Sequence, residues 1–203
     1  MIDSNKNRQT NQILSVQPPR SLCLCGYFML GDTTTETQRT QRLHRENEIM
    51  PDLLVNLLKL PPLESARDFI LRRAQPFELT PVRRFVAENF SPPWADEISV
   101  GFARQPISVY IATIDRELAG FAAYECTRRG FFGPTGVIPA AQGKGIGKAL
   151  LLASLWSLRE MGYVYAIIGA AGPVRFYQKS VGAIIIPDSE PGIYTDLLKA
   201  KDE

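Results

Sequence analysis

The sequence predicts a single α/β domain, in which strands and helices alternate along most of the chain. Its 203 residues and hydrophobic content of 45% suit one domain with a sizeable core. A predicted strand that ends at Ile138 is followed by a glycine-rich turn and then by a long apolar stretch typical of a helix. A further strand, helix and strand are predicted between Tyr163 and Ile186. We therefore assign residues 50–203 to one domain.

The N-terminal segment, residues 1–49, differs in composition from the rest of the chain. It is rich in Asn, Gln, Thr and Arg and has no sustained hydrophobic period, which predicts disorder. Met50 is a candidate start of translation, and an interaction tail is the alternative interpretation of the segment before it. Residues 50–63 predict a short amphipathic element that ends at Pro61-Pro62.

The elements of the domain are predicted in chain order from hydrophobic pattern, caps and turns. Strands are expected at Phe69–Ala74, Ser108–Ile114, Leu118–Cys126, Phe131–Ile138, Tyr163–Ile168 and Ala183–Ile186. Helices are expected at Val82–Phe90 behind a Thr80-Pro81 cap, from Ser91 with acids in the first turn, at Lys144–Met161, and after Gly172 with Pro173 as the first helical residue. Phe69–Ala74 is expected to be the first strand, and Tyr163–Ile168 is expected to be buried.

Composition excludes several functional classes. The formal net charge of +2 comes without a basic stripe, so nucleic acid is not an expected partner. No apolar run approaches the roughly 20 residues of a membrane helix, and three cysteines make no disulfide framework. The only histidine, His44, lies in the polar N-terminal segment, which disfavours a histidine-based nucleophile pair or metal site. We expect a cytoplasmic protein without a metal and without membrane contact.

The turn after Ile138 has the features of an anion site. Glycines at 143, 145 and 147 precede a helix, whose first N–H groups and dipole favour phosphate. The turn does not match a Walker A motif, because Gln142 and Ala149 stand where that motif needs a glycine and a Ser or Thr. A dinucleotide fingerprint fails on the glycine spacing. An ordinary strand-to-helix turn is the remaining alternative to a coenzyme A loop.

A second motif lies one helix and one strand further on. Gly172-Pro173 precedes a predicted short helix that carries Phe176-Tyr177-Gln178-Lys179. Together with Gln142, Gly145 and Gly147, this motif resembles the two signatures of the GNAT N-acetyltransferase superfamily, in the expected order. The resemblance covers Phe69 to Ala183 and implies a mixed, mostly antiparallel central sheet with helices on both faces.

The resemblance also implies acetyl-CoA as co-substrate and a set of residues that binds it. The backbone of Val137 and Ile138 would pair with the pantetheine amides, and the Gln142 side chain would support the loop. The pyrophosphate would lie on the loop residues, namely Gly143, Lys144, Gly145, Ile146, Gly147 and Lys148. Solvated surface charges are the alternative interpretation of the two lysines.

Two residues are the predicted catalytic groups. Tyr177 matches the GNAT tyrosine that protonates the departing thiolate, with an aromatic packing role as the alternative. The base that neutralises the amine is less evident, because Phe131–Ile138 contains no carboxylate. Glu125 on the neighbouring strand is the first candidate, followed by Asp96 or Glu97.

These observations predict an N-acetyltransferase in which a primary amine attacks the thioester of acetyl-CoA directly. A small molecule or a protein amino group is the expected acceptor. The sequence leaves open whether the protein forms a homodimer. The alternative function is a non-catalytic acyl-CoA-binding or interaction module on the same fold. The residues after Ile186 do not easily form a full final hairpin, so the edge of the sheet is left undecided.

Overall fold

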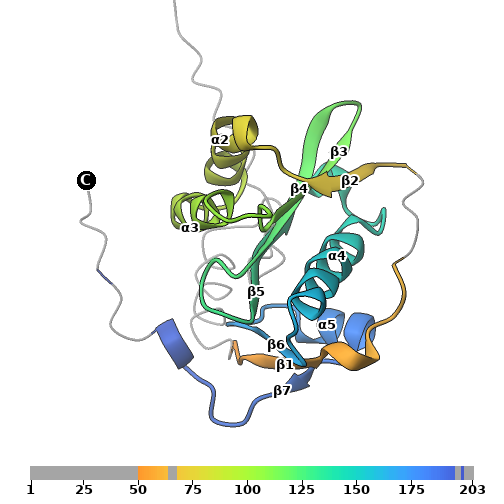
Figure 1. The fold of residues 1–203 in the computed structure, drawn as a ribbon, viewed down its shortest axis with the longest axis vertical. Helices are drawn as coiled ribbons and strands as arrows, with labels where there is room; N and C mark the ends of the chain where they lie inside the picture. The colour runs from red at the N-terminus through yellow and green to blue at the C-terminus, as the bar shows by residue number, and fades with distance from the viewer. Residues whose placement is uncertain (1–49, 64–67, 195–197, 199–203) are drawn as a thin grey trace, which may run out of the picture.

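A mixed, seven-stranded sheet forms the centre of the protein (Figure 1). The computed structural model describes residues 50–63, 68–194 and 198. The strand order is β2-β3-β4-β5-β6-β1-β7, with β5 and β6 parallel and all other neighbours antiparallel. The strands are β1 (Leu53–Asn56), β2 (Ile70–Arg73), β3 (Val109–Ile114), β4 (Glu117–Tyr124), β5 (Phe131–Val137), β6 (Tyr165–Ile168) and β7 (Ile184–Ile185). The expected fold class is confirmed.

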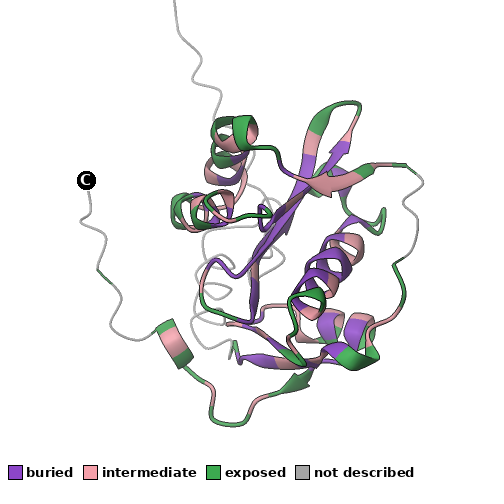
Figure 2. Ribbon diagram, in the orientation of Figure 1, coloured by how far each residue is buried: buried purple, intermediate pink, exposed green. Residues whose placement is uncertain are grey.

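Helices cover both faces of this sheet. The bounds are α2 (Leu79–Asn89), α3 (Pro92–Phe102), α4 (Ile146–Glu160) and α5 (Val174–Val181). Phe121 and Ala123 of β4 pack with α2 and α3, whereas Ala122 and Tyr124 pack with α4 and α5. Because successive strand residues point to opposite faces, the two helix pairs lie on opposite sides of the sheet. Figure 2 shows the buried residues concentrated in β4, β5 and the sheet side of α4.

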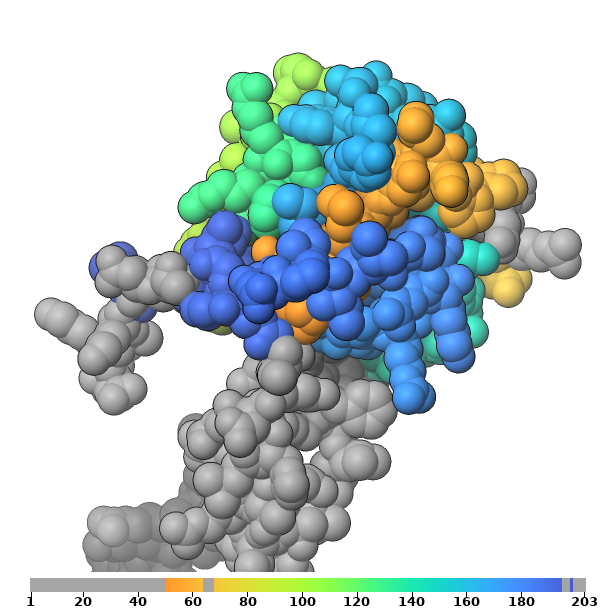
Figure 3. Space-filling model, turned by 90° about the horizontal axis from the view of Figure 1, so that it is seen from below, coloured from red at the N-terminus to blue at the C-terminus, as the bar shows by residue number. Residues whose placement is uncertain are grey.

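The first strand in the described part of the chain is β1, and the prediction that Phe69–Ala74 forms the first strand is wrong. That segment forms β2, at the edge of the sheet, and residues 50–63 contain β1 and a short 3-10 helix, Leu57–Lys59. Leu53 pairs with Ile168 of β6 and with Ile185 of β7, so β1 lies between these two strands. In Figure 3 the orange N-terminal residues lie against the blue C-terminal segment. A final hairpin is therefore unnecessary, because the N-terminal strand fills that place.

Two helix starts also differ from the sequence expectation. Helix α2 begins at Leu79, one residue before Thr80, and no side chain caps it. A charged turn precedes it, in which the Glu78 carboxylate accepts from Gln75 N at 2.7 Å and forms a salt bridge with Arg72. The first turn of α3 has no acid, because Asp96 and Glu97 stand one turn further on. Ser91 is the N-cap of α3, and Ser91 Oγ accepts from Trp94 N at 3.3 Å.

The region after α4 is less buried than expected. Gly162 follows the end of α4 in the left-handed region at φ 95°, and β6 begins only at Tyr165. Val164 is 43% exposed and Tyr165 is 53% exposed, because both stand at the open end of the sheet. Pro173 is the residue before α5 and not its first helical residue. Helix α4 itself is buried along most of its length, which holds its N-terminus firmly.

Candidate active site

The loop before α4 has the backbone that an anion site requires. Gly143 and Gly145 lie in the left-handed region at φ 78° and 80°. A Cβ at either position would meet no atom within 4 Å, so the space above both glycines is open. Gly145 is the N-cap of α4 and has no side-chain cap, while Ile146 is only 1% exposed and anchors the first turn in the core. The first N–H groups of α4 are thus presented at an open, rigid surface.

The end of β5 leads directly into this loop. Ile138 N donates to Ala119 O at 3.0 Å, and Ala141 N donates to Ile138 O at 3.0 Å, so both backbone groups of Ile138 have partners. Gly120 and Val137 face each other between β4 and β5, and this pattern turns the N–H and C=O of Val137 away from β4. Gln142 Nε2 donates to Val137 O at 3.3 Å. Because its backbone N–H and C=O point away from β4, Val137 is better placed than Ile138 to form hydrogen bonds with an added chain.

Strands β5 and β6 separate after two residue pairs. Phe131 pairs with Ile167 and Phe132 pairs with Ile168, and no pair follows between these strands. Gly133, at φ 124°, turns β5 away at this point. From Gly133 to Val137, four steps of about 3.3 Å each give about 13 Å of β5 edge that no other described strand pairs on the β6 side. The edge connects the point of separation with the glycine loop.

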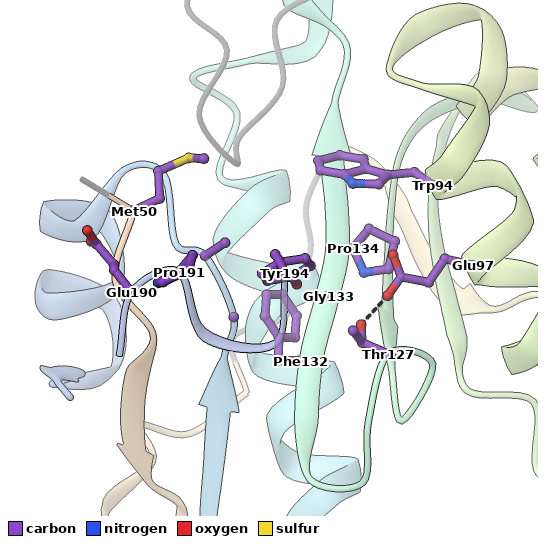
Figure 4. A pocket seen from close by; sticks show the side chains of 12 residues that line it. Met50, Trp94, Glu97, Thr127, Phe132, Gly133, Pro134, Glu190, Pro191 and Tyr194 are labelled. Carbon is purple, nitrogen blue, oxygen red and sulfur yellow. Dashed lines mark hydrogen bonds between the residues drawn. The ribbon is translucent and has the colours of Figure 1, made fainter. Parts of the chain in front are cut away.

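A cavity of about 670 Å³ lies at the point where the two strands separate (Figure 4). Its walls come from α3, from the turn after β4 together with the start of β5, and from the residues after β6 together with Met50 and the C-terminal segment. The lining residues are Met50, Trp94, Glu97, Thr127, Phe132, Gly133, Pro134, Gly169, Ala170, Glu190, Pro191 and Tyr194. The volume is in the range of small-molecule sites.

Glu97 is the carboxylate that α3 presents to this cavity. It accepts a hydrogen bond from the Thr127 hydroxyl, which Figure 4 draws as a dashed line. Burial raises the pKa of Glu97 above its ordinary value, and the Thr127 hydrogen bond offsets part of that rise. Its neighbour Asp96 is exposed and binds Arg83 at 2.7 Å, so the two acids have different surroundings.

Glu125 lies in the turn after β4 and does not line the cavity. Its side chain is 3% exposed, accepts from the backbone N–H of Gly130, and is 3.4 Å from Arg104. Glu125 itself has a positive φ of 61°. These contacts tie the turn together and leave the carboxylate little access to an amine. The sequence placed Glu125 before Asp96 and Glu97 as candidate base, and of these three Glu97 is the one that lines the cavity.

Tyr177 is on α5 and is fully buried. Its ring meets Phe176 edge-on at 5.1 Å and Phe132 at 6.4 Å between centroids. Phe132 lines the cavity, so Tyr177 lies one side chain behind the wall. Its role as an acid therefore stays a prediction.

The walls of the cavity depend on a residue that the sequence analysis did not single out. The Asp52 carboxylate accepts from Ala170 N at 2.8 Å, and Asp52 N donates to Ser189 Oγ at 2.9 Å. Asp52 thereby joins the N-terminal strand, the turn after β6 and the C-terminal segment. No local pattern marks this residue, because all of its partners are more than 100 residues away.

Other expectations concern metal and membrane. Within residues 50–63, 68–194 and 198, no group of three or more His, Cys, Asp or Glu side chains is placed to hold a metal ion. In the same part of the chain, no helix has the length and apolar character to cross a membrane. His44 and the rest of residues 1–49 lie outside the described residues. Cys126 is buried, and burial raises the pKa of its thiol to about 11.

Comparison with known proteins agrees with this geometry. Residues 105–180 match the family model of the acetyltransferase (GNAT) domain. This match includes the glycine loop, the gap after β5 and most of α5, and it covers less than half of the chain. The resemblance predicted from the two motifs is confirmed. No curated protein sequence matches the chain.

Solved structures share the fold at low sequence identity. One is the GCN5-related glucosamine N-acetyltransferase region of a fungal multi-domain GH3 β-N-acetylglucosaminidase, with a TM-score of 0.57 and 15% identity over 76% of this chain and 22% of that chain. Another is a GCN5-related N-acetyltransferase from Sphaerobacter thermophilus, with a TM-score of 0.53 and 17% identity over 75% of this chain and 54% of that chain. This chain thus spans less than two thirds of either protein, and the likeness is one of fold.

Proposed function

We propose that the protein is an N-acetyltransferase that transfers the acetyl group of acetyl-CoA to a primary amine. The observation that carries the proposal is the open glycine loop at the uncapped start of α4, connected by an unpaired strand edge to a cavity. A ligand that contacts both must be long and thin, with an anionic group at one end. Acetyl-CoA has this form, with its pyrophosphate distant from its thioester.

The loop would hold the pyrophosphate through backbone N–H groups near Gly145. Each charge-assisted hydrogen bond contributes about 1.5–3 kcal/mol, so two of them outweigh most contacts of the pantetheine arm. The arm would lie along the edge of β5, where the N–H and C=O of Val137 face the gap. Gln142 fixes the loop through its bond to Val137 O. The lysines at 144 and 148 would add attraction for phosphate.

The thioester would then lie where β5 and β6 separate, beside the cavity. The amine nitrogen attacks the carbonyl carbon, the carbon–nitrogen bond forms, and the carbon–sulfur bond breaks with its electron pair on sulfur. The amine must be neutral to attack, although an alkyl amine has a pKa near that of lysine, about 10.4. The thiolate that leaves takes up a proton, for which Tyr177 behind Phe132 is the proposed donor.

The test compares two glutamate substitutions at the two ends of α4. Gly145→Glu places a carboxylate against the phosphates. Gly162→Glu is the matched control, because Gly162 is also left-handed, at φ 95°, and also has no atom within 4 Å of a Cβ. We expect Gly145→Glu to lose at least two hydrogen bonds, about 3 kcal/mol, and to bind acetyl-CoA more than 100-fold more weakly by calorimetry.

The control should bind acetyl-CoA like the parent. Equal affinity in the parent and in folded Gly145→Glu would show that the loop does not hold the cofactor. Release of free thiol from acetyl-CoA across a panel of amines tests the transfer itself. Binding of acetyl-CoA without turnover on any amine would favour the alternative, a non-catalytic acyl-CoA-binding module.

A further inference from the structure

The cavity differs from most protein surfaces in the chemistry of its walls. Aromatic and cyclic side chains make up much of it, with Trp94, Phe132, Pro134, Pro191 and Tyr194 on facing sides. Such walls favour a flat or apolar molecule, because aromatic rings bury large areas and stack on one another. The volume of about 670 Å³ suits a small molecule better than a protein segment.

The two charged side chains that line the cavity within the described part of the chain are both acidic. Glu97 stands on the α3 wall and Glu190 on the opposite, C-terminal wall (Figure 4). Among the described residues that line the cavity, none is a lysine or an arginine. A ligand with a carboxylate or phosphate would be repelled here, whereas an ammonium group is attracted. Glu190 is exposed at the rim, so its contribution is to attract cations rather than to bind one tightly.

Glu97 is better placed for chemistry than Glu190. It is half-buried, its side chain is held by the Thr127 hydroxyl, and α3 fixes its position beside Trp94 and Pro134. Proton transfer requires a group held within reach of the reacting nitrogen, and a side chain with a fixed partner meets that condition. Pro134 belongs to the unpaired edge of β5, so Glu97 faces the point where the thioester would lie.

We propose that the cavity takes a small primary amine with an apolar or aromatic body and no acidic group, and that Glu97 accepts the proton this amine must lose. The proposal rests on the function proposed above. The ammonium gives one proton to the Glu97 carboxylate, and the neutral nitrogen attacks the thioester carbonyl. The carbon–sulfur bond breaks, Tyr177 gives its proton to the thiolate, the second nitrogen proton restores the Tyr177 hydroxyl, and Glu97 returns its proton to water.

The first experiment measures binding and does not depend on turnover. The chain has two tryptophans, so Trp156→Phe leaves Trp94 in the cavity wall as the only one. Phenethylamine and phenylalanine are titrated against its fluorescence, because they share ring and amine and differ by a carboxylate. We expect saturable binding of phenethylamine and at least tenfold weaker binding of phenylalanine. Equal affinity, or no response to either amine, overturns the proposed substrate class.

The second experiment tests Glu97 with its neighbour as control. Glu97→Gln keeps the shape and removes the base, whereas Asp96→Asn changes an exposed acid of the same helix that does not line the cavity. With phenethylamine, kcat should fall about 10²–10⁴-fold in Glu97→Gln and stay near the parent in Asp96→Asn. The dissociation constant of acetyl-CoA should stay unchanged in both variants.

The outcomes separate this inference from the proposed function. Parental turnover in a folded Glu97→Gln variant overturns the role of Glu97 while acetyl transfer stands. Turnover that prefers phenylalanine, or a lysine-containing peptide, over phenethylamine overturns the substrate class and again leaves acetyl transfer standing. Absence of thiol release with every amine contradicts the proposed function, and the fluorescence titration still decides which amines the cavity binds.

Discussion

The position of β1 inside the sheet can be tested with two adjacent leucines. Leu53 is fully buried in the core beneath α4 and α5, whereas Leu54 points to the other face and is half-buried. Replacing a buried leucine by alanine removes its transfer free energy and leaves a cavity, which costs about 2.7–5 kcal/mol in a well-packed core. We therefore expect Leu53→Ala to lower the free energy of unfolding by about 3 kcal/mol and Leu54→Ala to lower it by about 1 kcal/mol.

The measurement is thermal or urea unfolding followed by circular dichroism. For a chain of this size, each kcal/mol shifts the melting temperature by about 2–4 °C, so Leu53→Ala should melt about 6–12 °C below the parent. Leu54→Ala should stay within about 4 °C. Equal shifts in the two variants would mean that β1 does not alternate between a buried and an open face. In that case the strand would not hold Met50 and Asp52 at the cavity.

Four further predictions follow from the site and from the sequence. A chain that begins at Met50 should melt within a few degrees of the full chain and bind acetyl-CoA equally well, and a much lower melting point would show that the preceding residues pack on the domain. Tyr177→Phe should reduce kcat about 10²–10⁴-fold while the acetyl-CoA dissociation constant stays constant; unchanged turnover would leave only a packing role. Asp52→Asn weakens the hydrogen bond to Ala170 N, so KM for the amine should rise while acetyl-CoA binding is kept, and an unchanged KM would contradict its role in positioning the wall. Because burial raises the pKa of Glu97, the base form is lost as pH falls through a value above the ordinary 4.3 or so, and kcat/KM should fall there in the parent but not in Glu97→Gln.

We assign the expected fall of kcat/KM at low pH to Glu97 because of the groups that surround its carboxylate. The Thr127 hydroxyl is its hydrogen-bond partner, and the buried Cys126 thiol is the titratable group whose pKa its charge helps to raise. The thiol, with a pKa of about 11, stays neutral across the range in which Glu97 titrates. An acid limb that persists in Glu97→Gln would assign the titration to another group.

The glycine loop could be predicted from sequence because its causes are local. A strand end, left-handed glycines and the start of an apolar helix all lie within the fifteen or so residues from Phe131 to Ile146, and each leaves its own residue pattern. The order of strands and helices from Ile70 to Ile185 was predictable for the same reason. The start of α2 was missed by three residues, because the charged turn around Glu78 competes with the Thr80-Pro81 signal.

The sequence by itself determined the domain class, the glycine-rich loop before α4 and the aromatic motif of α5, since backbone propensity and hydrophobic period act over a few residues. Only the tertiary structure decided which acid faces the cavity. Glu97 with Thr127 on one wall and Glu190 on the other face the cavity because of how α3, the turn after β4 and the C-terminal segment pack, and Glu125 turns instead to Arg104. The place of β1 was also decided by tertiary structure. Strand pairing over more than 100 residues depends on which buried edge is left open, and that edge exists only once the other strands have assembled.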